Sequence, residues 1–348
     1  MALTEIADLF TPDIWLRALR EKMATFPSLL NSGVAVSDAV FDAIASGAGT
    51  KANIPFFKDI TDDADAIQVE NSAPTDGQIT TGTQIAPILN RVTSNAVTAL
   101  SGQVSGEDPA GAITDQIVAR RMKQRQTTLL SVLRGAFDGT GAKDAAAELS
   151  ENRLEYFDES GLDATADQTF SADLFITGKA LLGELADELA GGALWIHPNV
   201  LATLEIADKE SFKDGVESGL PFTVRTYRGV PIFVSSQLRR NGTTNGSVYE
   251  TYLLARGIVA KGEKPQVSGP INSPVLDVAS FNITVDAAKN NLTMYDRTRF
   301  VMHLNGMKYV GTPAGQSATN TELATAADWD FVYSSEARTG AVLIRTNK

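Results

Sequence analysis

The feature that most constrains this fold is a long stretch with a helical pattern that begins at Pro109. Asp108 is a good helix cap, and proline is tolerated at the first helical position because an N–H there would have no partner within the helix. No further proline occurs until Pro198. Apolar residues recur mostly three and four positions apart, at Ile113, Ile117, Val118, Met122, Leu129, Leu133 and Phe137. This spacing predicts one helix from Pro109 to Phe137, on the order of 40 Å long at about 1.5 Å per residue.

Before this helix, residues 52–100 have the pattern of extended chain. Pro74-Thr75-Asp76-Gly77 is a strong turn signal. Apolar and β-branched residues alternate on both sides of it, from Ile54 to Val69 and from Ile79 to Ile85. The pattern predicts a long hairpin with a polar, acidic tip. Because a two-stranded ribbon is only marginally stable alone in water, we expect it to lie on another surface, most simply that of a neighbouring subunit.

Helical and strand signals mark the rest of the chain. Pro12 opens a first helix, and a short helix after Ser37-Asp38 ends at the glycines 47–49. Ser171 caps a helix with Leu174, Leu181, Leu185 and Leu189 on one face, stopped by Gly191-Gly192. From residue 193 we expect an α/β region with a helix opened by Pro198. The expected strands cover residues 194–196, 222–224, 230–234, 249–254, 275–285, 300–310 and 341–344.

Two Asn-Gly pairs, Asn241-Gly242 and Asn245-Gly246, predict a hairpin turn between the strands at 230–234 and 249–254. Such pairs favour tight and exposed turns. The loop from residue 239 to 246 is therefore expected to project from its domain.

Composition excludes several classes of protein. The net charge of -12 argues against a dedicated nucleic-acid binder, which would use Lys and Arg to contact phosphates. An acidic balance can also serve only to keep the protein soluble. The absence of cysteine removes disulfides and thiolate chemistry and fits a reducing cytoplasm. No apolar run is long enough to cross a membrane, and the N-terminus does not have the pattern of a signal peptide.

The sequence gives little sign of catalysis, and we expect neither an enzyme nor a cofactor. His197 and His303 lie in unrelated segments and are expected to have structural roles. Asp62, Asp63 and Asp65 lack the glycine and glutamate that complete a calcium loop. Neither a phosphate-binding nor a dinucleotide-binding glycine pattern is present.

Several short motifs, taken in order, carry a resemblance over nearly the whole chain. They are Ser32-Gly33-Val34, Asn53-Ile54-Pro55-Phe56-Phe57, Leu100-Ser101-Gly102, Asp108-Pro109, Trp195-Ile196-His197-Pro198, Tyr227-Arg228-Gly229-Val230-Pro231-Ile232, Phe300-Val301-Met302-His303-Leu304-Asn305-Gly306-Met307-Lys308 and Ala326-Ala327-Asp328-Trp329. No single motif is specific, so their order and spacing carry the weight. The chain resembles the major capsid proteins of tailed phages, which share the Hong Kong 97 fold. It looks most like the siphophage branch that assembles on a separate scaffolding protein.

The resemblance implies an α+β fold with named parts. Residues 1–46 would be the N-arm, 47–104 the extended hairpin called the E-loop, and 105–192 the spine helix with the first part of the P domain. Residues 193–286 would be the A domain at capsomer centres, and 287–348 the return strands of the P domain with the C-terminus. The N-arm begins almost at once, which suggests a separate scaffold or prior cleavage.

The resemblance also implies the function and the partners. Many copies would form the hexamers and pentamers of an icosahedral or prolate head enclosing double-stranded DNA. Scaffolding protein and portal would be partners during assembly in the bacterial cytoplasm. Packaged DNA would be contacted only weakly and non-specifically, and no membrane would be bound.

Two groups of residues are candidate assembly sites. The first pairs an acidic hairpin segment with a basic cluster in the middle of the long helix of the next subunit: Asp59, Asp62, Asp63, Asp65 and Glu70 against Arg120, Arg121, Lys123 and Arg125. Charge pairs at an interface mainly set register and partner choice. A solvated helix face and contact with packaged DNA stay open as alternatives for the cluster. The second group is a capsomer-axis loop: Arg239, Arg240, Asn241, Gly242, Asn245 and Gly246.

Two rival functions remain. An encapsulin-type nanocompartment shell has the same fold and differs in its cargo. A secreted or surface α/β hydrolase would need a nucleophile elbow or a clustered acid–base pair, and the sequence has neither.

Overall fold

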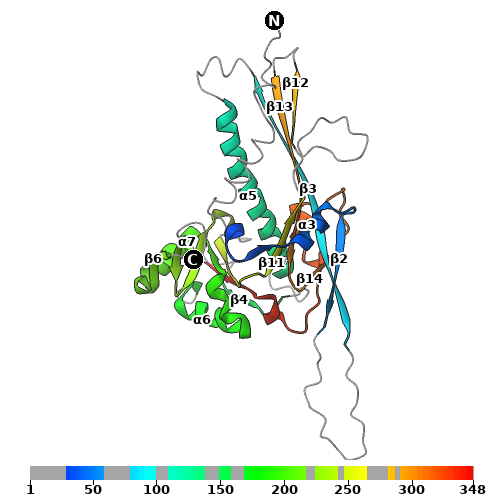
Figure 1. Ribbon diagram of the computed structural model, residues 1–348. Helices are drawn as coiled ribbons and strands as arrows, with labels where there is room; N and C mark the ends of the chain where they lie inside the picture. The colour runs from blue at the N-terminus through cyan, green and yellow to red at the C-terminus, as the bar shows by residue number, and fades with distance from the viewer. Residues whose placement is uncertain are drawn as a thin grey trace, which may run out of the picture.

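The computed structural model describes residues 29–58, 79–98, 109–137, 149–157, 168–216, 224–241, 247–264, 281–286 and 291–347. The N-terminal helix expected from Pro12 and the turn at residues 74–77 lie outside these ranges. Two eight-stranded sheets form the body, with a long helix against them (Figure 1). None of the helices described is long and apolar enough to cross a membrane.

The long helix, α5, covers Pro109–Phe137, as the sequence predicts. Its C-terminal half is buried through Leu129, Leu133 and Phe137, whereas Ala119 and Arg120 near its middle are exposed. Among the helix residues whose side chains are described, those from Leu129 to Phe137 pack most completely against the core. Asp108, the expected cap, lies outside the described residues.

The hairpin expected before this helix is present at its base. Strand β2 (Lys51–Phe57) pairs antiparallel with β3 (Thr81–Thr98), from Lys51 opposite Pro87 to Phe57 opposite Thr81. Strand β3 is much longer than its alternating pattern predicts. Beyond the hairpin it pairs with β13 (Asn291–Leu304), from Ile88 opposite Val301 to Thr98 opposite Asn291. One strand thus connects the hairpin at one end of the molecule to β13 at the other (Figure 1).

Strand β3 is central to the first sheet, whose order is β1-β11-β13-β3-β14-β15. Strand β12 pairs with β13, and β2 with β3. The remaining strands are β1 (Ala35–Ser37), β11 (Val259–Glu263), β12 (Phe281–Asp286), β14 (Met307–Tyr309) and β15 (Trp329–Phe331). Helix α3 (Ala39–Ser46) packs on β11 and begins with Asp38, whose carboxylate accepts from the Val40 N–H. Its start and its end at Gly47 are as predicted.

The second sheet has the order β4-β16-β10-β5-β8-β7-β6, with β9 paired to β10. Its strands are β4 (Arg153–Tyr156), β5 (Ala193–Ile196), β6 (Phe212–Val216), β7 (Val224–Tyr227), β8 (Val230–Val234), β9 (Arg239–Asn241), β10 (Ser247–Leu254) and β16 (Ala341–Thr346). Strands β4 and β16 belong to it, although both lie outside residues 193–286. Strands β11 and β12 lie inside that range but belong to the first sheet. The domain boundaries stay a prediction, and the sheet to which each of these four strands belongs does not follow them.

Each face of the second sheet is buried against a different layer. Strand β10 alternates: Leu253 belongs to a cluster with residues of α6 (Ala172–Leu181) and α7 (Pro198–Ala207), whereas Tyr252 and Leu254 join a cluster with α5. The α5 cluster also contains Met302 and Tyr309 of the first sheet. The spine helix therefore shares one core with both sheets.

The helix expected from Ser171 to residue 190 is wrong in its length. Ser171 does cap it, accepting from the Leu174 N–H, but α6 ends at Leu181. Gly183 has φ +55°, a left-handed conformation that no α-helix continues through. Two short 3-10 turns follow, Gly183–Ala186 and Glu188–Gly191. The apolar spacing persists because these turns still pack Leu189 into the core.

Two predicted strand arrangements are also wrong. The strand at 230–234 does not form a hairpin with the one at 249–254: β8 pairs with β5 and β7, and β10 takes β9 as its hairpin partner. The strand expected at 300–310 is divided into β13 and β14 by a turn at Asn305-Gly306, where Gly306 has φ +85°. The strand expected at 341–344 is confirmed as β16, which pairs with β10 and with β4.

Gly135 of α5 provides a test of this packing. A methyl group there would overlap the Leu323 carbonyl oxygen and the Trp329 indole nitrogen. We expect Gly135→Ala to lower the free energy of unfolding by about 1–3 kcal/mol, although alanine is the better helix former by about 1 kcal/mol. Denaturant unfolding of the unassembled subunit measures this. Gly315→Ala is the matched control, because no atom lies within 4 Å of the added methyl group; equal stability of the two variants would contradict the packing.

Candidate assembly interface

Arg121, in the basic cluster of α5, forms a buried ion pair with Asp296 of β13. The Arg121 Nε donates to Asp296 Oδ2 at 2.6 Å, and its Nη2 donates to Oδ1. Only 6% and 3% of the two side chains are exposed. A two-pronged contact of this kind satisfies both groups and makes burial of the charges tolerable. A solvated position for Arg121 is therefore wrong, and its first partner lies within its own subunit.

The other members of the cluster divide between buried and exposed positions. Arg125 contacts Glu263 of β11 at 2.5 Å, and its guanidinium lies 5.2 Å from the centre of the Phe300 ring. Arg120 is exposed and donates to Asn95 Oδ1 at 3.4 Å, and Lys123 is exposed. The solvated-face interpretation therefore fits Arg120 and Lys123 and fails for Arg121 and Arg125.

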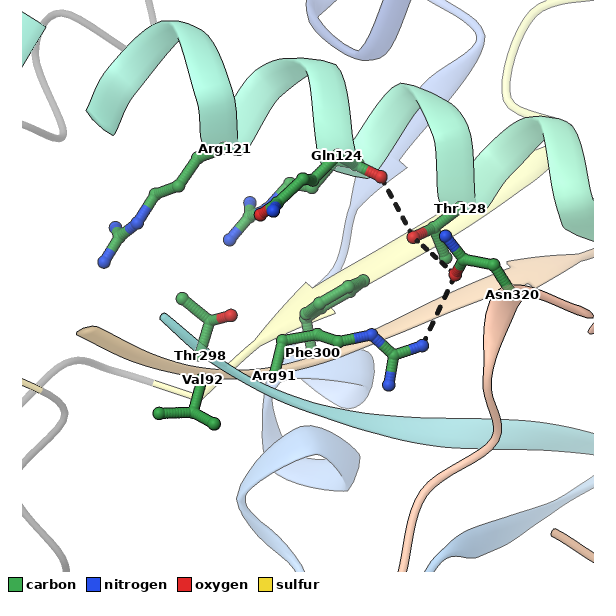
Figure 2. A pocket seen from close by; sticks show the side chains of 9 residues that line it. Arg91, Val92, Arg121, Gln124, Thr128, Thr298, Phe300 and Asn320 are labelled. Atoms are coloured by element: carbon green, nitrogen blue, oxygen red, sulfur yellow. Dashed lines mark hydrogen bonds between the residues drawn. The ribbon is translucent and has the colours of Figure 1, made fainter. Parts of the chain in front are cut away.

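A pocket of about 240 Å³ lies between α5 and the first sheet, and Arg121 lines it (Figure 2). Helix α5 provides Arg121, Gln124, Arg125 and Thr128; the strands provide Arg91, Val92, Thr298 and Phe300; and α8 (Asn320–Leu323) provides Asn320. The lining thus contains three arginines and no carboxylate. Asp296 and Glu263, which pair with two of the arginines, are not part of the wall.

Arg91 is the functional candidate that sequence reasoning missed. Its Nη2 donates to the Ala318 carbonyl at 2.7 Å and approaches Asn320 Oδ1 at 3.4 Å, while its Nη1 contacts Ser317 Oγ at 3.1 Å. Burial lowers the pKa of Arg91, and Glu322 partly offsets this effect. A single arginine in a β-branched strand gives no signal in the sequence, because Ser317 and Ala318, to which it donates, lie more than 200 positions away.

The base of the hairpin is held by a second polar cluster. The Gln84 Oε1 of β3 lies 2.8 Å from His303 Nε2 and accepts from the Gly306 N–H at 3.2 Å. The Gln84 amide nitrogen donates to Tyr333 Oη at 3.0 Å, and the Tyr333 ring packs edge-on against Phe56 of β2. Burial lowers the pKa of His303 to about 4, so its ring is neutral at physiological pH. His197 caps α7 by accepting from the Asn199 N–H. Both histidines thus make structural contacts.

The acidic members of the predicted pairing, Asp59, Asp62, Asp63, Asp65 and Glu70, lie outside the described residues. So do Gly242, Asn245 and Gly246 of the predicted loop. The pairing and the position of the loop therefore stay predictions.

Known proteins of similar sequence and fold show which family the chain resembles. The major capsid protein of Bacillus phage SPP1 is 25% identical over 343 residues, 96% of this chain and 95% of that protein. The capsid of Ralstonia phage GP4 has a similar fold, with a TM-score of 0.59 at 10% identity, covering 92% of this chain and 91% of that one. The capsid of cyanophage Pam1 reaches 0.50 at 13% identity, covering 91% and 89%. No protein-family model matches the chain.

The chain resembles the major capsid proteins of tailed bacteriophages in both sequence and fold. The similarity to the SPP1 protein spans nearly all of both chains, and the solved phage capsids share the Hong Kong 97-type α+β fold. The expected family and fold class are confirmed, and the encapsulin alternative is not favoured.

A buried charge cluster holds the start of the predicted axis loop. Glu250 of β10 is fully buried, and Arg134 of α5 contacts it at 2.8 Å. Arg240 and Arg345 approach it at 3.6 Å. Burial lowers the pKa of Arg240. At Arg134 burial acts in the same direction, but Glu250 and Tyr252 together outweigh it and raise the pKa. Arg240 therefore has a partner within its own subunit, and its place in the predicted axis loop stays a prediction.

We expect Arg121→Met to lower the free energy of unfolding by about 3–5 kcal/mol, because it leaves Asp296 buried without its partner. The double variant Arg121→Met, Asp296→Leu should recover most of this loss, since two apolar side chains need no pairing. Urea unfolding of the unassembled subunit measures both. Arg120→Met, at the exposed neighbour, should change stability by less than about 0.5 kcal/mol. Additive losses in the double variant would contradict the pairing.

His303 should make the subunit less stable in acid. Its pKa is about 4 when folded and about 6.5 when unfolded, so the unfolded chain binds the extra proton between these values. Stability attributable to His303 is then fully present above about pH 6.5 and decreases as the pH falls towards 4, by up to about 3 kcal/mol. Comparing the unfolding free energies of wild type and His303→Gln over this range subtracts the carboxylates common to both. Parallel pH profiles would contradict a neutral, buried imidazole.

Proposed function

We propose that this capsid protein assembles into the hexamers and pentamers of an icosahedral or prolate phage head that encloses double-stranded DNA. The observation that carries the proposal is the near-complete match to the SPP1 major capsid protein. The hairpin supports it, because two apolar side chains are exposed where its described part stops: Phe57 is 76% and Ile79 is 64% accessible in the single subunit. Side chains of this size and exposure are suited to burial against another copy.

We further propose the partners expected of such a shell. A separate scaffolding protein and a portal would act during assembly in the host cytoplasm, and the finished protein would be a virion component. DNA would be contacted weakly and non-specifically. The net charge of -12 supports weak contact, since a negative subunit gains little from phosphate binding. We propose no catalytic role.

The loop after β9 is proposed to face the capsomer axis. Strands β9 and β10 form the hairpin that carries it, with Asn241 opposite Ser247. Because Arg240 is anchored to Glu250, the projecting part begins at Asn241. Residues 241–246 are therefore the segment that we assign to the axis.

Electron microscopy and analytical ultracentrifugation of the purified chain test this function. We expect rings or closed shells, alone or with a scaffolding protein, and no hydrolase activity. A reconstruction of the rings should place residues 241–246 at their centres. A compact monomer under every condition, with or without scaffold, would contradict the proposal.

A further inference from the structure

The turn that divides β13 from β14 contains a chemically reactive pair, Asn305 followed by Gly306. Glycine has no side chain to keep its backbone nitrogen away from the preceding asparagine. That nitrogen can attack Cγ of Asn305 and form a new carbon–nitrogen bond. The bond from Cγ to the side-chain nitrogen then breaks, and ammonia leaves with the proton of the Gly306 N–H. Water opens the cyclic imide to aspartate or isoaspartate, so the reaction needs no enzyme and no oxidant.

In the folded subunit, both nitrogens that this reaction must move are held by other segments of the chain. The Gly306 N–H, which belongs to the nucleophile, donates to Gln84 Oε1 of β3 at 3.2 Å. The Asn305 Nδ2, which is the leaving group, donates to the Gly257 carbonyl at 3.1 Å. Cyclisation would break both hydrogen bonds before any new bond could form.

The backbone of the turn is held as well. The Asn305 N–H donates to the Ile258 carbonyl, and the Gly306 carbonyl accepts from the Val332 N–H, each at 3.0 Å. The Tyr333 ring covers Gly306 so closely that a methyl group there would lie 2.5 Å from a ring carbon. The peptide between the two residues would have to rotate to bring its nitrogen to Cγ, and these contacts oppose that rotation.

Gln84 is fixed in the orientation that holds the Gly306 N–H. Its side chain is buried, and its Oε1 also lies 2.8 Å from His303 Nε2. Its amide nitrogen donates to Tyr333 Oη at 3.0 Å. Because both ends of the amide have partners, the oxygen stays directed at the turn. Gln84 therefore does more than join the hairpin to the body, since it also engages the reactive nitrogen.

We propose that Asn305-Gly306 is a latent deamidation site, which Gln84 at the base of the hairpin keeps unreacted. While the base is closed, the nucleophile and the leaving group are held apart. When the base opens, the pair reacts as it would in an unfolded chain. Isoaspartate adds one carbon to the backbone, so the turn can no longer form its native hydrogen bonds. The reaction thus permanently marks a subunit whose hairpin base has opened, and the inference does not depend on the proposed assembly.

Peptide mapping of the full-length chain tests the proposal. Trypsin releases residues 300–308 as one peptide in which Asn305 is the only asparagine. Residues 241–256, which contain two further Asn-Gly pairs, form another peptide and serve as a reference for the intrinsic rate. The native chain and the chain unfolded in guanidinium chloride are incubated in mildly alkaline buffer, and mass spectrometry measures the loss of each amide. Comparing Asn305 with itself in the two states removes the effect of the local sequence.

We expect Asn305 to react in guanidinium chloride about as fast as the reference pairs. In the native subunit its rate should be lower by at least about tenfold, because reaction then requires local opening. Equal native and unfolded rates at Asn305 would overturn the inference. This comparison uses only the wild-type chain, so it stands even if a variant fails to fold.

Two variants separate Gln84 from general packing. Gln84→Leu removes the acceptor of the Gly306 N–H at similar size, and it should raise the native rate at Asn305 by about 2- to 13-fold, the net effect of one hydrogen bond. Tyr333→Phe is the matched control, because it removes the other partner of Gln84 and leaves the contact with Gly306. Its rate should equal that of the wild type. An unchanged rate in Gln84→Leu, or an equal rise in Tyr333→Phe, would overturn the role assigned to Gln84.

Discussion

The buried pair of Arg121 and Asp296 fixes where the spine helix lies on the first sheet, and much of the structure depends on that position. Two charges removed from water are costly unless each satisfies the other, and here both prongs of the guanidinium meet both carboxylate oxygens. The pair therefore admits one geometry of α5 over β13. Asp296 also lies opposite Thr93 of β3 in the sheet register. The helix is thus held in register with the strand that forms the hairpin.

Strand β3 extends this constraint to the projecting hairpin. Its first part, from Thr81 to Pro87, pairs with β2, and the remainder pairs with β13 beneath α5. Gln84 joins the two regions by bonding to His303 and Gly306 at the place where the hairpin leaves the body. A shell subunit needs a projecting arm whose direction is set by the body. One continuous strand, with buried polar contacts at the point of departure, provides such an arm.

Local signals in the sequence predicted the elements that local physics controls. Pro109 marked the start of the long helix and the apolar spacing its end, because helix geometry repeats the same contacts every turn. Asp38 and Ser171 marked the caps of two further helices. The predictions failed where a single residue ended an element or where a strand distant in sequence took the pairing position. Gly183 ended α6 in a left-handed conformation, and β10 paired with β9 in place of β8 because β5 and β7 already occupy both edges of β8.

For the candidate site, too, the sequence predicted some features and the tertiary structure decided others. The sequence by itself determined the long helix, the hairpin and a basic cluster on that helix, since each follows from spacing along one segment. The fold class followed from the resemblance of its ordered motifs to a known family. Only the tertiary structure decided which of the basic residues are buried. Arg121 and Arg125 meet carboxylates more than 130 positions away, and Arg91 joins them from a different element. Which carboxylate lies near each arginine depends on distances between segments that fold together, and no pattern within one segment contains those distances.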